Sequence, residues 1–332
     1  MPIIKSLRKK HNPKENENVS YSPPLKITGG DKVYTAGGYT VHMFLTPGPH
    51  QLKIEPVKDL PKEMMGLIVD RTLEVLMVGA GGAGGGYSGG GGGGEVLYIS
   101  RNVGTGTFPL NVAPATSGDN GAWSAAKCGT GTTGFGETAK GGGSGRASDD
   151  SIPANPYTPV ANGGAGSSRT AGYFGQQGTS VGTGVTRHGG FRGGQENSPA
   201  NDAPNYPGHG GGGAGQSITG NTGGGGNGGA GGSGVSYSLT GTALFWGGGG
   251  GGQTYYGGQG GAGGAGGGAA GSGGNGGNSG GSGLNPGGST NAASSGASGG
   301  ANTGGGGGSG NGQNGSTGGG GGSGVVIVRY PT

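Results

Sequence analysis

Long stretches of this sequence place glycine at two of every three positions, and that spacing limits what the chain can fold into. The other residue recurs at every third position, as in Gln259, Ala262 and Ala265. Between residues 247 and 324 the only aliphatic side chain larger than alanine is Leu284. Side-chain burial therefore cannot supply a hydrophobic core there. Order in this segment must come from backbone hydrogen bonds, or else the segment is a flexible linker.

A period of three favours order. It matches the left-handed polyproline II helix, which has three residues per turn, about 3.1 Å rise per residue and no internal hydrogen bonds. Collagen shares the period but needs one glycine per triplet and abundant proline, whereas this chain has 101 glycines and only 18 prolines in 332 residues. Packed side by side, such helices can bond to one another through the backbone, and their close approach excludes a Cβ. We expect polyglycine II helices joined by loops, with runs such as 89–94 and 247–252 in the interior.

Apolar residues concentrate in short β-prone runs on either side of the glycine-rich region. Residues 32–35, 39–45 and 50–54 predict a β-meander, with turns at 37–38 and 46–49.

Three further strands are expected at 73–78, 95–103 and 108–112, and a short helix around 62–65. The terminal run 325–330 is a strand that we expect to pair near 73–78. The fold class is therefore all-β, a small antiparallel framework closed by the C-terminal strand, with a large glycine-rich insertion forming a polyglycine II bundle and loops. The expected parts are a basic arm (1–28), the framework (29–112, with a first glycine block at 79–94), the bundle (113–324) and the closing strand (325–332).

Charge is segregated along the chain. The net charge is only +4, and residues 203–328 contain no Lys, Arg, Asp or Glu. Such a stretch cannot bind nucleic acid through phosphate neutralisation, which needs several cationic contacts. The basic residues cluster in the arm, whose docking candidates are Lys5, Arg8, Lys9 and Lys10.

Motifs that resemble catalytic or cofactor sites lack their required context. Gly79-Ala-Gly-Gly-Ala-Gly84 follows a strand and matches G-x-G-x-x-G, but more glycines follow where a pyrophosphate-binding helix is needed. The five histidines show no metal-ligand spacing, and Cys128 has no evident catalytic partners. No stretch approaches the roughly 20 apolar residues of a membrane span. We expect no enzyme activity, no metal, no cofactor and no membrane insertion.

Aromatic residues lie among small polar residues in the segments between the glycine runs. Aromatic side chains presented on loops by a rigid scaffold commonly form contact surfaces. The candidate receptor-contact residues are Trp123, Tyr157, Tyr173, Phe174, Phe191, Tyr206, Tyr255 and Tyr256. Hydrophobic caps on the ends of the bundle are the alternative for each ring, and for Phe245 and Trp246 we favour a cap or core position.

Three short segments carry a family resemblance. Residues 39–44 (Tyr-Thr-Val-His-Met-Phe), 73–82 (Leu-Glu-Val-Leu-Met-Val-Gly-Ala-Gly-Gly) and 322–331 (Gly-Ser-Gly-Val-Val-Ile-Val-Arg-Tyr-Pro) surround the long glycine blocks. From about Thr28 to its end, the chain resembles the glycine-rich domain of bacteriophage tail fibres and related virion proteins. It is more loosely similar to the polyglycine-helix adhesins at the tips of some phage tail fibres.

This resemblance implies a virion protein, a tail fibre or adhesin component that recognises the host surface through variable loops. Its partners would be other virion proteins, through the arm, and a bacterial surface saccharide or outer-membrane protein. A purely structural virion decoration of the head, neck, tail or baseplate is the alternative, and a homotrimer stays open. A third class, an ice-binding polyglycine bundle, would need a regular face of small apolar or Thr residues, whereas the third positions here mix Asn, Gln, Ser and Ala.

Overall fold

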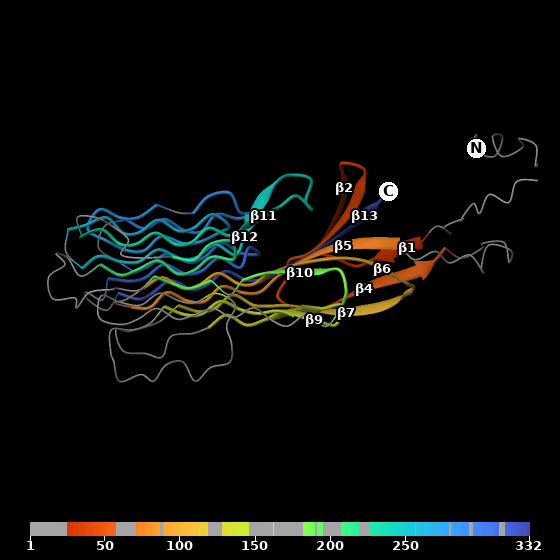
Figure 1. Cartoon of the computed structure of the whole chain (residues 1–332), viewed down its shortest axis with the longest axis horizontal. Coiled ribbons are helices and arrows are strands. Elements are labelled where there is room, and N and C mark those ends of the chain that lie inside the picture. Colours follow the sequence, from red (N-terminus) through yellow and green to blue (C-terminus); the bar gives the residue numbers. More distant parts are fainter. Residues whose placement is uncertain are drawn as a thin grey trace, which may run out of the picture.

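The molecule is elongated, with β-sheets at one end and glycine-rich runs extending from them along the long axis (Figure 1). The computed structural model describes residues 25–57, 71–86, 89–118, 128–145, 162, 182–189, 191–194, 207–218, 226–255, 257–278, 280–291, 295–311 and 316–332. Within these ranges the regular secondary structure is all β, the sheets are antiparallel and there is no α-helix. The short helix expected around 62–65 lies outside the described residues. Among the described residues, no helix is long and apolar enough to cross a membrane.

Three sheets make up the β-structured end. The six-stranded sheet has the order β10 (Val185–His188), β6 (Val96–Val103), β5 (Arg71–Val78), β13 (Val325–Pro331), β3 (Tyr39–Phe44) and β2 (Lys32–Ala36). The five-stranded sheet has the order β1 (Leu25–Thr28), β4 (Gly48–Pro56), β7 (Gly106–Val112), β8 (Thr132–Gly134) and β9 (Glu137–Ala139). The third sheet is the two-stranded pair β11 (Val235–Tyr237) and β12 (Leu244–Trp246).

The central strands of the six-stranded sheet are buried on both faces, which explains their apolar runs at residues 75–78 and 325–328. In β5, Leu73, Val75 and Met77 belong to one hydrophobic cluster, which also contains residues of the five-stranded sheet. Leu76 and Val78 belong to a second cluster, which includes side chains of the β11–β12 pair. The alternation of side chains along a strand thus assigns neighbouring residues to two separate cores.

The last strand, β13, lies in the middle of the six-stranded sheet. It pairs with β5 in the register Val325↔Val78 and with β3 in the register Val326↔Phe44, antiparallel in both cases. The pairing of residues 325–330 with 73–78 is therefore as expected from the sequence. The strands that come before and after the glycine-rich region, β5 and β13, are thus neighbours in one sheet.

Several short strands depart from the expected organisation. β1 occupies the last four residues of the predicted arm and pairs with β4 in the register Leu25↔Pro56, because Ile27 is buried in the core. β8, β9, β10, β11 and β12 lie inside the segment that the sequence assigned to the glycine bundle and its loops. Each of these five has only three or four residues, so its own sequence pattern is too short to stand out.

The glycine runs bond to their neighbours in a repeat of three. In residues 89–95, successive N–H groups donate in turn to three different runs, with N···O distances of 2.6–2.9 Å. Gly90 and Gly93 donate to His209 and Gly212, Gly91 and Gly94 to Gly307 and Gly304, and Gly92 and Glu95 to Gly143 and Lys140. The partner run therefore changes from one residue to the next and recurs at every third residue.

The run 247–252 is surrounded in the same way. It donates hydrogen bonds to residues in 229–232 and 266–269, to Thr303 and to Gly91, and it accepts them from residues in 211–214, 261–264 and 306–309. A Cβ added at Gly249, Gly250 or Gly251 would lie within 3.0 Å of a neighbouring backbone atom. Backbone packing on every side explains why this run contains only glycine.

Candidate functional site

The glycine runs alternately lead away from the sheets and back to them, so the turns between runs lie at two distinct ends. Residues 247–252 leave β12, and 259–265 return toward the sheets after a turn at 253–258. That turn lies at the end of the bundle remote from the sheets (Figure 1). The next turn lies at the sheet end, because a Cβ at Gly266 would be 2.9 Å from the backbone of Trp246.

Only two of the eight candidate contact residues are among the described residues. Tyr255 is half-buried in the turn remote from the sheets. Phe191 is half-buried, and its N–H donates to the Asn162 side-chain oxygen at 3.3 Å. The others lie outside the described residues, as do all four docking candidates: Trp123, Tyr157, Tyr173, Phe174, Tyr206 and Tyr256, and Lys5, Arg8, Lys9 and Lys10. No receptor surface is assembled from the predicted aromatic residues within the described part of the chain.

The aromatic residues near the sheets form a cap. Trp246 is only 1% exposed and belongs to the second core, which confirms the core position expected for it. Tyr237 on β11 stacks on Tyr98 of β6 with 5.2 Å between ring centroids, and its hydroxyl lies 2.7 Å from His188 Nε2. This group joins the sheet to the β11–β12 pair at the base of the glycine runs.

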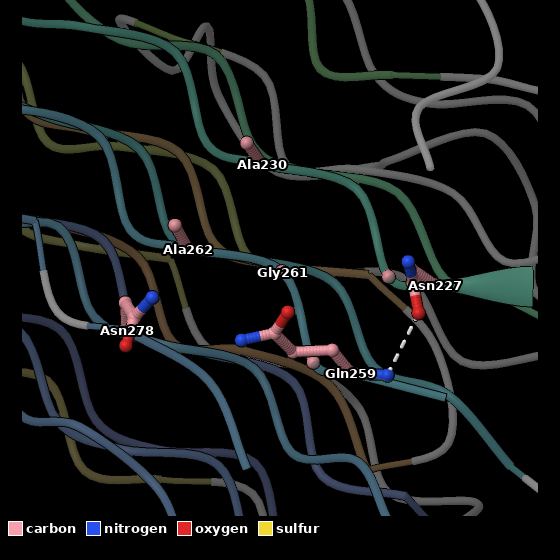
Figure 2. A pocket seen from close by; sticks show the side chains of 8 residues that line it. Asn227, Ala230, Gln259, Gly261, Ala262 and Asn278 are labelled. Carbon is pink, nitrogen blue, oxygen red and sulfur yellow. Dashed lines mark hydrogen bonds between the residues drawn. The ribbon is translucent and has the colours of Figure 1, made fainter. Parts of the chain in front are cut away.

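A groove lies on the side of the bundle where three parallel runs meet, and Figure 2 shows it. Its volume is about 460 Å³, and it is lined by Asn227, Gly228, Ala230, Gln259, Gly260, Gly261, Ala262 and Asn278. Backbone bonds fix the register of the runs: Gly228 donates to Gln259 and Gly231 to Ala262 between the first two, and Gly263 to Asn278 between the last two, over 2.8–3.0 Å.

Every non-glycine residue that lines this groove occupies the third position of a Gly-Gly-X triplet. The Gln259 backbone N–H donates to Asn227 Oδ1 at 2.8 Å, which orients that amide. The lining has no titratable side chain, so the groove can hydrogen-bond a ligand but cannot catalyse proton transfer. The sequence interpretation treated these positions as places where a side chain is tolerated and missed that three of them meet. The recurrence of a non-glycine residue at every third position was the sequence signal that could have revealed the groove.

Among the described residues, a cluster of buried charges ties the edges of the two large sheets together. Arg187 on β10 lies 3.1 Å from Glu95 and 2.6 Å from Glu137 on β9, and the exposed fractions of the three side chains are 7%, 0% and 1%. The Glu95 carboxylate also accepts the N–H of Lys140, and Glu137 that of Gly182. The cluster is enclosed, and through Arg187 it connects β10 to β9. Across the described residues, no group of three or more His, Cys, Asp or Glu is placed to hold a metal ion.

A buried histidine is expected to make the stability of the bundle depend on pH. His209 is 2% exposed, neither ring nitrogen has a hydrogen-bond partner among the described residues, and burial lowers its pKa to about 4. The unfolded chain, with an ordinary histidine pKa near 6.5, binds the proton first. Stability is therefore expected to fall as pH drops from about 6.5 toward 4, by up to about 3 kcal/mol.

Urea denaturation of wild type and His209→Leu at pH 7.0 and pH 4.5 measures this effect. The difference between the two pH values should shrink in the variant, because its buried side chain no longer titrates. An equal loss of stability in both proteins would assign the acid sensitivity to other groups.

No protein-family model matches this chain, and no curated protein is similar to it at a significant level.

Proposed function

We propose that this protein is a bacteriophage virion component, a tail fibre or adhesin subunit that presents loops to the host surface. The observation that carries the proposal is that the two ends of the elongated molecule differ. Its described chain enters at β1, at the sheet end, while the turn containing Tyr255 lies at the opposite end of the long axis (Figure 1). A protein that docks at one end and makes contacts at the other needs this arrangement.

We propose further that the glycine runs are polyglycine II helices. The support is the rotation of hydrogen-bond partners with a period of three in residues 89–95 and 247–252. Such helices make no internal hydrogen bonds, so bonds to neighbouring runs are their only means of satisfying the backbone. A bundle held in this way is stiff, because moving one helix breaks bonds to several others.

The C-terminal strand closes the framework in this proposal. The support is its central position, between β5 and β3, with both faces buried. Both ends of the glycine-rich insertion are thereby anchored in one sheet. Loop sequences at the remote end can then vary without loss of the framework, as host recognition demands.

The partners we propose are another virion protein, at the basic arm, and a bacterial surface saccharide or outer-membrane protein, at the loops. The absence of Lys, Arg, Asp and Glu from residues 203–328 fits a binding mode that depends little on salt. The clustering of basic residues in the arm favours the second candidate function, a decoration protein that only docks onto the particle.

Exchange of loop segments in particles that carry the protein distinguishes the two candidates. Replacing residues 148–161 or 195–206 with the same length of Gly/Ser sequence is expected to lower adsorption to the host at least tenfold while particles still assemble. Deleting residues 1–24 is expected to remove the protein from the particle. Normal adsorption by every loop variant, combined with loss of incorporation on arm deletion, would reject the adhesin role and leave the decoration role.

A further inference from the structure

The groove of Figure 2 carries an inference that deepens the proposed function and rests on it. We propose that this groove, on the side of the bundle rather than at its loops, binds a neutral saccharide chain. Its volume of about 460 Å³ falls within the range of roughly 300–1,000 Å³ that is usual for small-molecule sites.

Two amide side chains in the groove are available to a ligand. The side chains of Gln259 and Asn278 are exposed, and neither makes a hydrogen bond to another described residue. Figure 2 shows the Gln259 amide extending along the groove toward Asn278. Each amide offers two N–H donors and a carbonyl acceptor, which matches the mixed donor and acceptor character of sugar hydroxyls.

The lining between these amides consists of small residues. Ala230 and Ala262 contribute methyl groups, and the remaining lining is glycine backbone, so a ring can approach closely. Along each of the first two runs an amide is followed by a methyl group three residues later, a spacing of about 9 Å in a polyproline II-type helix. A repeat in two adjacent runs suits an extended polymer better than a single compact molecule.

Charge and polarity select the class of ligand. The lining contains no ionisable group, so an anionic or cationic ligand would gain no ion pair there and would lose hydration. It also contains no large apolar or aromatic side chain to anchor a peptide. A hydroxyl-rich, uncharged chain loses least on entering such a groove and can replace its water contacts with amide hydrogen bonds.

The test measures binding of the purified full chain to an array of neutral hexose and N-acetylhexosamine oligosaccharides, with sialylated and uronic-acid oligosaccharides alongside. We expect binding to neutral probes that changes little between 50 and 500 mM salt. Gln259→Ala combined with Asn278→Ala should weaken it about thirtyfold, since each substitution removes at least one typical hydrogen bond to the ligand. Ala262→Glu, which places a charged side chain in the lining, should abolish it.

The control is Gln51→Ala, which removes an exposed amide from β4, in the five-stranded sheet. It should bind like wild type, and thermal unfolding should show that all variants remain folded. Preference for acidic probes, no binding to any neutral probe, or equal binding by wild type and the groove variants would overturn the inference. The proposed function fails separately, through normal host adsorption by every loop variant, so the two failures are distinguishable.

Discussion

Gly250→Ala is expected to destabilise the glycine bundle by about 4 kcal/mol or more, although it adds a single methyl group. The Cβ would lie 2.6 Å from the carbonyl carbon of Gly307, closer still to its oxygen and 3.1 Å from the oxygen of Gly306. These are backbone atoms and cannot rotate away. Separating the two runs would break the bonds from Gly306 to Gly248 and from Ser309 to Gly251, each worth roughly 1 kcal/mol, in addition to the overpacking itself.

Gly281→Ala is the matched control. Gly281 is exposed, its φ lies outside the left-handed region, and a Cβ there has no heavy atom within 4 Å. The same substitution at this site should change stability by less than 1 kcal/mol, with a small gain from the less flexible unfolded chain. Urea denaturation followed by circular dichroism measures both variants. Equal stability of the two would mean that the runs are not packed backbone to backbone.

Arg187→Met is the second substitution with a large expected effect, about 3–5 kcal/mol of lost stability. It leaves the buried carboxylates of Glu95 and Glu137 without the guanidinium that lies 3.1 and 2.6 Å from them. Breaking a buried ion pair from one side is costly because the remaining charge stays desolvated. Adding Glu95→Gln and Glu137→Gln to the same protein removes those charges and should recover most of the loss.

Arg329→Met provides the comparison. Arg329 pairs with Glu74 at 2.6 Å, but the exposed fractions of these side chains are 17% and 20%. Water screens this pair more strongly, so we expect a loss of only about 1 kcal/mol. Thermal and chemical denaturation of the variants, each with wild type in parallel, measures the difference. A loss at Arg187 no larger than that at Arg329 would contradict a structural role for the buried cluster.

The strands of the framework were predictable because each carries its own apolar run. The apolar runs at residues 73–78 and 325–330 predict buried strands, and these two strands pair in the structure. The position of β13 between β5 and β3 could not be predicted from the sequence, because β13 could have paired with any of several strands. β1 was missed because four residues after two prolines carry only Leu25 and Ile27 as apolar positions.

The glycine runs show a different limit. Their period of three was readable because close backbone contact leaves a strict spacing in the sequence. The sequence could not predict which run lies beside which, since one Gly-Gly-X triplet is nearly the same as any other. The groove was missed for that reason: Asn227, Gln259 and Asn278 come from separate runs and become neighbours only through the backbone bonds between them. The contact roles of the candidate loop aromatics stay predictions.

The rotation of partners every three residues also restricts how such a protein can change over generations. Inserting one residue into run 247–252 would turn every later N–H in that run toward the wrong neighbour, whereas inserting a whole triplet would restore the direction of each bond. Runs should therefore gain or lose length in multiples of three, and in several adjacent segments together. The turns are free of this constraint. Homologous sequences should then differ by arbitrary lengths at the turns but by whole triplets within the runs.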